Sequence, residues 1–346
     1  MKKTLFTLFA FTFALAFVAC QKEQTVINNT DNPGTNPPAT PTEPTYQEGV
    51  YAPLMKIASL NYDDESVQTW TWNGEQLVSV QGENGDSRQF TYSNGRIASV
   101  SGTIGDLMGI ISGISGTVSF TYNGTLLKDC TANSDGTDIL LALFNHADNR
   151  ISSVDAAVDA EYISSMLNGM IHRGGERKYV DPKQIKLTAE DSSIHADFVW
   201  TGKNVTRMTT QGSIPFGLSK ETYETLKPYM PIDSAMLRLI DMYFMVSNSL
   251  PLVIDIADTM DFTYDTKINP FYCYLGDVTP ANLSLNNVLS SSNYGRMDIS
   301  VALGATPTKV LSRPIDERSV YFYEYNDKNY PVKVEGTDNY TITYKE

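Results

Sequence analysis

The chain has 346 residues, of which 41% are hydrophobic, 11% aromatic and 19% charged. This is the composition of an ordinary globular protein, and it excludes collagen-like, coiled-coil and wholly disordered chains. The net charge of −14 argues against a nucleic-acid partner, because contacts to phosphate groups need clustered lysine and arginine.

The first residues are typical of a bacterial lipoprotein leader. Two lysines precede an apolar run at 5–18, which is shorter than the stretch of about 20 apolar residues that spans a bilayer, so residues 1–19 are predicted to be a signal peptide. Cys20 follows directly and resembles the lipobox cysteine, whose thiol is acylated when the leader is removed, although Phe17 stands where leucine is usual. The alternative is an ordinary secretory leader followed by an incidental cysteine.

The segment after Cys20 is predicted to hold the protein at a membrane. Residues 21–24 (Gln-Lys-Glu-Gln) resemble the short charged signal that sends many Bacteroidetes lipoproteins to the outer face of the outer membrane. We therefore expect a lipid anchor in the outer membrane with the protein facing outward, and the periplasmic leaflet is the alternative. Residues 20–49 are rich in proline, threonine and asparagine, which cannot bury enough apolar surface to offset the entropy of ordering, so they are predicted to form a disordered tether.

The strongest pattern in the chain is a repeated hairpin. Residues 70–74, 90–95 and 120–124 each contain an aromatic residue, a threonine, a second aromatic residue and an Asn-Gly pair, and an apolar run follows each of them. Alternating aromatic and β-branched residues favour a half-buried strand, and Asn-Gly favours a two-residue type I′ turn. The sequence therefore predicts an antiparallel meander. Weaker copies of the pattern occur at 198–202, 262–265, 323–327 and 340–344.

These repeats resemble the YD-type hairpins of Rhs proteins, and more closely a family of Bacteroidetes lipoproteins of unknown function with degenerate YD-like hairpins. The matching stretches are 263–271, 286–288 and 323–332, and the resemblance covers about residues 55–346. It implies a hairpin-built sheet in a surface lipoprotein and no activity, and the toxin-delivery role of Rhs proteins does not follow from it.

Three segments interrupt the hairpins and are predicted to be helical, near 104–116, 157–173 and 219–250. In the third, Ser219 and Asp233 are placed to cap two helices, and the second of these is apolar nearly all round. We predict a single mainly β domain at 50–346, built as a twisted antiparallel sheet with helical insertions packed on one face. The helices at 219–250 either pack against the concave face of the sheet or cover an apolar pocket lined by Leu237, Ile240 and Phe244.

The sequence contains no motif typical of an enzyme, and we predict no catalytic residue, no cofactor and no metal site. Trp72 and Trp200 are candidates for stacking on sugar rings, with a place in the core as the alternative. Ser234 and Thr259 follow aspartates in the short motif of Bacteroidetes O-glycosylation, although Asp233 also suits a helix cap. Two thiols besides Cys20 remain at positions 130 and 273, and they form either a disulfide or two buried free cysteines.

The functional prediction has two versions. The first is a non-enzymatic, lipid-anchored cell-surface lipoprotein that binds an extracellular ligand, either a glycan or a protein. The second is a periplasmic carrier or chaperone that holds an apolar cargo under the 219–250 helices. In both versions the membrane is a partner through the lipid anchor, and nucleic acid is not.

Overall fold

The computed structural model describes residues 43–64, 66–83, 85–108, 110–111, 113–164, 187–189, 192–229, 233–303, 307–337 and 339–345. The predicted signal peptide, the lipidation site at Cys20 and most of the predicted tether lie outside these ranges. Predictions about them therefore stay predictions.

The described chain is mainly β, as predicted, and its strands form one antiparallel sheet. The strands of the first half are β1 (Ile57–Tyr62), β2 (Val67–Asn73), β3 (Gln76–Gly82), β4 (Ser87–Ser93), β5 (Arg96–Thr103), β6 (Ser115–Asn123), β7 (Leu126–Ser134), β8 (Thr137–Ala147) and β9 (Arg150–Val158). Those of the second half are β10 (Leu187–Ala189), β11 (Ser192–Thr201), β12 (Asn204–Ser219), β13 (Ser249–Ile268), β14 (Asn286–Val301), β15 (Thr308–Val320), β16 (Phe322–Tyr325), β17 (Pro331–Glu335) and β18 (Tyr340–Tyr344).

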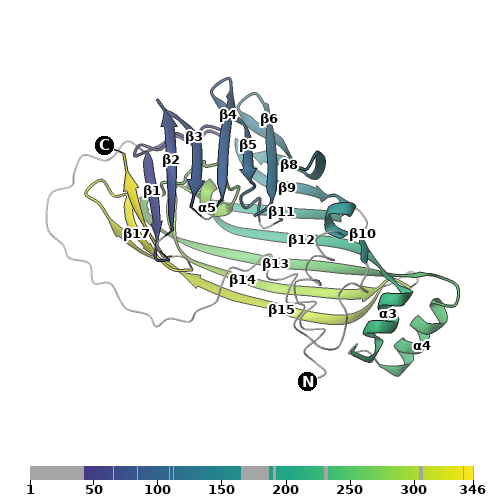
Figure 1. Ribbon diagram of the computed structural model, residues 1–346. Helices are drawn as coiled ribbons and strands as arrows, with labels where there is room; N and C mark the ends of the chain where they lie inside the picture. The colour runs from purple at the N-terminus through teal and green to yellow at the C-terminus, as the bar shows by residue number, and fades with distance from the viewer. Residues whose placement is uncertain are drawn as a thin grey trace.

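Strand pairing follows the chain almost without a break. The order runs β16, β17, β18, β1 and then β2 to β9, followed by β11 to β15, with β10 also paired to β12. The two ends of this order, β15 and β16, are joined by Tyr321 alone, whose backbone N–H donates to the carbonyl of Leu289. The sheet therefore curves back on itself. Figure 1 shows the short strands β1–β6 standing at a steep angle to the long, curved strands β12–β15.

The hairpin turns follow the predicted chemistry with one correction. Asn94 and Gly95 both have positive φ, 51° and 78°, and they form the two-residue turn that was predicted for type I′. In the first and third repeats the turn starts one residue later than predicted, because Asn73 pairs with Gln76 and Gly74 becomes the first turn residue. A positive φ at the first turn position alone is the requirement of a type II′ turn, which glycine meets without strain. The same shift occurs at Gly124.

The helix predicted near 104–116 does not form in the described residues. The segment is a loop that leads into β6, and it is bonded both to itself and to residues 276–278. Within the loop, the N–H of Leu107 donates to the carbonyl of Ile111. The N–H of Met108 donates to the carbonyl of Val278, whose own N–H donates to the carbonyl of Asp106. Repeated glycines weaken a helix here, and at Gly105 a Cβ would collide with the carbonyl oxygen of Gly276. Gly105 therefore allows the two backbones to lie in close contact.

The insertion near 157–173 is only partly described. Val158 ends β9, and helix occupies 160–164, where the described residues stop. The remainder of this predicted helix lies outside the described ranges.

The helices predicted at 219–250 form with the predicted caps. Ser219 accepts a hydrogen bond from Thr222 N at the start of α3 (Lys220–Leu226), which continues into η2 (Lys227–Tyr229). Asp233 caps α4 (Ser234–Tyr243) by accepting from two backbone N–H groups. These helices connect the end of β12 to the start of β13, so they lie beyond the far ends of the long strands and not over the concave face (Figure 1). A short helix, α5 (Pro280–Leu283), lies in the connection between β13 and β14.

In the described part of the chain, no helix combines the length and apolar character needed to cross a membrane.

Candidate ligand-binding pocket

A cavity of about 770 Å³ lies on the inner face of the long strands β12–β15. Its opposite wall is made by the 104–111 loop and by the segment 269–282, which contains α5. This volume falls within the range of about 300–1,000 Å³ that is typical of small-molecule sites. The predominantly apolar lining is also typical of such sites.

Strand pairing places the cavity side chains in rows across the four strands. Because side chains alternate between the two faces of a strand, every second residue points inward. The pairings define three neighbouring rows, each read from β12 to β15. They are Gly212–Ile256–Met297–Arg313, Thr210–Asp258–Gly295–Ile315 and Met208–Met260–Asn293–Glu317.

Two glycines in these rows allow neighbouring strands to pack closely. Gly212 lines the cavity, and an added Cβ there would lie 3.2 Å from the side chain of Ile194, its paired residue on β11. At Gly295 an added Cβ would collide with the backbone of β13 at Ala257.

The apolar part of the lining is unusually rich in methionine. Met108, Met208, Met260 and Met297 all line the cavity, together with isoleucine and phenylalanine side chains. Methionine is unbranched and flexible, so a methionine-lined wall adapts to apolar ligands of different shape. The cavity is therefore suited to an apolar group without demanding one rigid outline.

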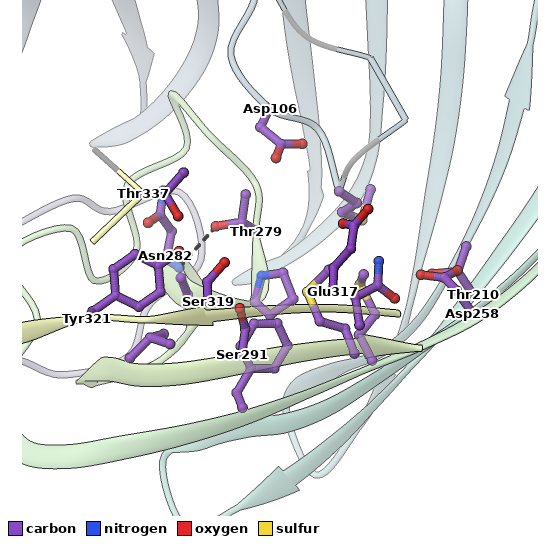
Figure 2. A pocket seen from close by; sticks show the side chains of 18 of the residues that line it. Asp106, Thr210, Asp258, Thr279, Asn282, Ser291, Glu317, Ser319, Tyr321 and Thr337 are labelled. Carbon is purple, nitrogen blue, oxygen red and sulfur yellow. Dashed lines mark hydrogen bonds between the residues drawn. The ribbon is translucent and has the colours of Figure 1, made fainter. Parts of the chain in front are cut away.

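One wall of the cavity carries a carboxyl group that is partly neutral. Figure 2 shows Asp258 and Thr210 side by side on adjacent strands. Burial raises the pKa of Asp258 to about 6, and the hydrogen bond with Thr210 opposes this shift. Asp258 therefore changes charge at mildly acidic pH, and in its protonated form it can donate a hydrogen bond into the cavity.

A second pair of polar side chains lies on the same inner sheet face, on β14 and β15. Burial raises the pKa of Glu317, and the positive charge of Arg313 opposes this shift. Asn293, directly opposite Glu317 on the neighbouring strand, has a buried Oδ1 with no hydrogen-bond partner among the described residues. A buried acceptor without a partner costs about 1–3 kcal/mol, so a ligand that donates a hydrogen bond there would remove this cost.

The residues predicted to form an apolar pocket do not line this cavity. Ile240 and Phe244 are buried, at 0% and 4% exposure, and Phe244 stacks on Tyr223 of α3 at a centroid distance of 4.9 Å. Leu237 is half-buried against the same cluster. They form the small core that joins α3 to α4, whereas the cavity lies further along the strands. The polar residues of the cavity were missed because Thr210, Asp258, Asn293 and Glu317 look like surface positions in a sequence.

Trp72 and Trp200, the predicted sugar-stacking residues, are held in the sheet. Each indole Nε1 donates to a backbone carbonyl of a neighbouring strand, Trp72 to Ile57 and Trp200 to Ile151, both at 2.7 Å. Tyrosines at equivalent positions of other hairpins make the same contact. The tyrosine hydroxyls of Tyr92, Tyr122, Tyr264, Tyr323 and Tyr344 donate to the carbonyls of Leu77, Ile97, Val205, Val288 and Pro331, respectively. We call this repeated contact the aromatic clamp.

The remaining predicted positions lie apart from the cavity or outside its lining. Ser234 is exposed at the start of α4, where Asp233 Oδ1 accepts from the N–H groups of Ala235 and Met236 at 2.8 Å. Thr259 is half-buried on β13, and it is not among the residues that line the cavity. The surroundings of Ser234 and Thr259 do not test whether either residue is glycosylated.

The two described cysteines, Cys130 on β7 and Cys273 before α5, are free and buried. Burial raises the pKa of each thiol to about 12. Of the two sequence alternatives, the free pair is therefore the one present.

A buried carboxylate fastens the first described residues to the hairpins. Glu48 is 4% exposed and accepts hydrogen bonds from Tyr46 and from the N–H of Leu127. His146 Nε2 lies 2.9 Å from Glu48 Oε2. His146 occupies the position in the β8–β9 hairpin that an aromatic clamp residue holds in the others, since it follows the same register shift. We call residues 46–51 the N-terminal strap.

Within the described ranges, no group of three or more histidine, cysteine, aspartate or glutamate side chains could hold a metal ion. In comparisons with known proteins, no protein-family model matches the chain and no curated protein matches it.

Proposed function

We propose that this protein is a non-enzymatic, lipid-anchored outer-membrane lipoprotein that binds a small amphipathic ligand in the β12–β15 cavity. The observation that carries the proposal is the cavity itself: an inner sheet surface with methionine and aliphatic walls and with polar groups at defined positions. A mainly apolar concave site with a few placed polar groups is the usual form of a small-molecule site.

The proposal keeps the apolar cargo of the second functional prediction and places its binding site elsewhere in the fold. The cargo lies on the inner faces of the long strands, whereas the sequence interpretation placed it under the 219–250 helices. The proposal does not use Trp72 and Trp200 as sugar-stacking residues, because Trp72 packs against Tyr51 and the guanidinium of Arg150 lies over the ring of Trp200 at 5.0 Å. Anchoring through Cys20 and an outward orientation at the cell surface remain part of the proposal.

The polar groups of the cavity favour a ligand with a polar end. Thr210 and Asp258 lie in one row of the inner sheet face, and Asn293 and Glu317 lie in the neighbouring row. A ligand whose polar end meets these two rows can place its apolar part against the methionine and aliphatic side chains.

The test is to obstruct the cavity. Ser291 of β14 lines it, whereas the next residue, Ser292, points to the opposite face of the same strand. In Ser291→Trp we expect the apolar fluorescent probe N-phenyl-1-naphthylamine to bind at least about tenfold more weakly, because the indole would overlap the space that the probe occupies. Ser292→Trp is the matched control and should bind the probe as the original protein does.

Two results would contradict the proposal. One is that the original protein fails to bind the probe, and the other is that Ser291→Trp and Ser292→Trp bind it equally. Native mass spectrometry of protein purified from its own cells gives an independent check, since a retained ligand would add mass to the original protein and to Ser292→Trp but not to Ser291→Trp.

A further inference from the structure

The helical end of the molecule exposes a cluster of large apolar side chains. Leu239 and Met242 lie on α4, and Met245 and Val246 follow in the turn after it, with exposures of 46%, 65%, 83% and 86%. We call these four residues the helical tip. Their spacing of three or four residues places them on one side of the helix and its extension. Exposed apolar clusters of this kind mark interaction sites in soluble proteins.

The opposite side of α4 is already occupied. Ile240 and Phe244 are buried against α3, and Asp241 faces α3 as well, where it accepts from Tyr223 at 2.8 Å and pairs with Lys227 at 2.6 Å. The helix therefore cannot rotate to hide the helical tip without exposing its packed face and breaking this ion pair. The exposure of the helical tip is a consequence of how α3 and α4 pack.

The helical tip lies at the end of the strands that line the cavity. Beyond the cavity, the inner faces of β12 and β13 continue toward α3 and α4 with buried apolar side chains that include Ile214, Phe216 and Ile254. Figure 1 shows both helices projecting past the ends of β12–β15. The helical tip is thus the projecting apolar end of the same strands that hold the ligand site.

The length of the tether allows the helical tip to meet the membrane that holds the anchor. The described chain begins at Glu43, which pairs with Lys203 at the start of β12. The helical tip lies at the other end of β12, whose 16 residues span about 50 Å. The 22 residues between Cys20 and Glu43 can extend to about 70 Å. The tether is therefore long enough for the protein to lie with its helical tip on the bilayer.

We propose that the helical tip inserts into the surface of the lipid bilayer in which the protein is anchored, so that an apolar ligand passes between that bilayer and the cavity. This inference rests on the proposed function, because it uses the lipid anchor and the ligand cavity. A stable protein interface buries about 1,000 Å² or more, and four side chains on a projecting helix end offer much less. Shallow insertion into lipid needs only a small apolar surface when an acyl anchor supplies the second attachment.

The experiment uses residues 21–346, which keep every described residue and lack both the leader and the acylated thiol. Flotation with vesicles of phosphatidylethanolamine and phosphatidylglycerol measures membrane binding. The variant Met242→Glu/Met245→Glu/Val246→Glu should bind vesicles at least about tenfold more weakly, because charged side chains are costly to place in lipid. Leu141→Glu, at a 44% exposed position on β8, is the matched control and should float as the original chain does.

Binding of N-phenyl-1-naphthylamine in the absence of vesicles separates this inference from the proposed function. The triple variant should retain probe binding, which also shows that it is folded. Equal flotation of the original chain and the triple variant, or no flotation of either, overturns the inference. It is also overturned if the original chain dimerises in solution and the triple variant is monomeric, because a second copy would then cover the helical tip. If the original chain does not bind the probe, the proposed ligand site is wrong. The flotation result then tests membrane binding by the helical tip independently of that site.

Discussion

Asp258 shows how a single side chain can link the ligand cavity to pH. Its carboxyl group lies beside Thr210, with Gly295 opposite it on the neighbouring strand, and burial raises its pKa to about 6. An acid whose pKa is higher in the folded state than in the unfolded state binds more protons when folded. Its contribution to stability is therefore present at low pH and is lost as the pH rises from about 4 to about 6.

We predict that Asp258→Asn removes this loss. At pH 7 the variant should be more stable than the original protein by about 2 kcal/mol, because the cavity no longer holds an ionised carboxylate, and the difference should shrink toward pH 4. Urea unfolding at both pH values measures it. Asp255→Asn is the control on the same strand, where the side chain is exposed. An unchanged dependence of stability on pH in Asp258→Asn would show that the carboxyl group is adequately solvated.

The aromatic clamp shows what a residue pattern can and cannot reveal. The second aromatic residue of each hairpin was recognisable from the repeat, and its role in the core was one of the two interpretations of Trp72 and Trp200. What the sequence could not reveal is that each donor reaches a carbonyl in a neighbouring strand, since that depends on the twist of the assembled sheet. His146 occupies the same hairpin position as the aromatic clamp residues, but this equivalence is recognisable only from the strand registers, because histidine differs in side-chain type from the tryptophans and tyrosines of the clamp.

At the scale of elements, local turn chemistry was predictable and long-range packing was not. The Asn-Gly hairpins and the caps at Ser219 and Asp233 depend on neighbouring residues, so they could be read from the sequence. The long strands β12–β15 were harder, because inward residues such as Asp258, Asn293 and Glu317 break the alternation of apolar and polar residues. The cavity could not be predicted from the sequence, because these polar residues hide which face of each strand points inward.

The loop near 104–116 is the clearest element-level difference. Leu107 and Ile111 have helical spacing, yet Leu107 bridges to Ile111 and to Val278 in extended pairing. The apolar residues of this loop cover the inner face of the sheet through contacts with 276–278. That covering depends on Gly105, where no side chain separates the two backbones.

We predict that Gly105→Ala pushes the loop away from Gly276, because the added Cβ would collide with the carbonyl oxygen. The loss of packing should cost about 1–3 kcal/mol in unfolding free energy and should speed release of N-phenyl-1-naphthylamine by opening this wall of the cavity. Stopped-flow displacement measures the release. Gly116→Ala is the control for the same chemical change, since its added Cβ would also collide with a backbone carbonyl oxygen, that of Asn133, while Gly116 is not among the residues that line the cavity. Equal release from both variants would mean that the loop does not close the cavity.

At the scale of the whole molecule, the N-terminal strap connects the tether to the sheet. It crosses several hairpins: Glu48 contacts β7 and β8, the carbonyl of Gly49 accepts from Ile97 N, and Tyr51 packs against Trp72 at a centroid distance of 5.6 Å. A force on the chain before this segment would therefore act on several hairpins at once.

We predict that Glu48→Ala releases the strap and destabilises the protein by about 3 kcal/mol or more, because three buried hydrogen-bonding contacts lose their shared acceptor. Thermal unfolding measures the loss, and limited proteolysis should show new cleavage between residues 43 and 51. Glu43→Ala is the matched control: its ion pair with Lys203 is about half exposed on both sides, and such pairs contribute about 0–1 kcal/mol. If Glu48→Ala resists cleavage as the control does, Tyr51 and the backbone contacts hold the strap without the carboxylate.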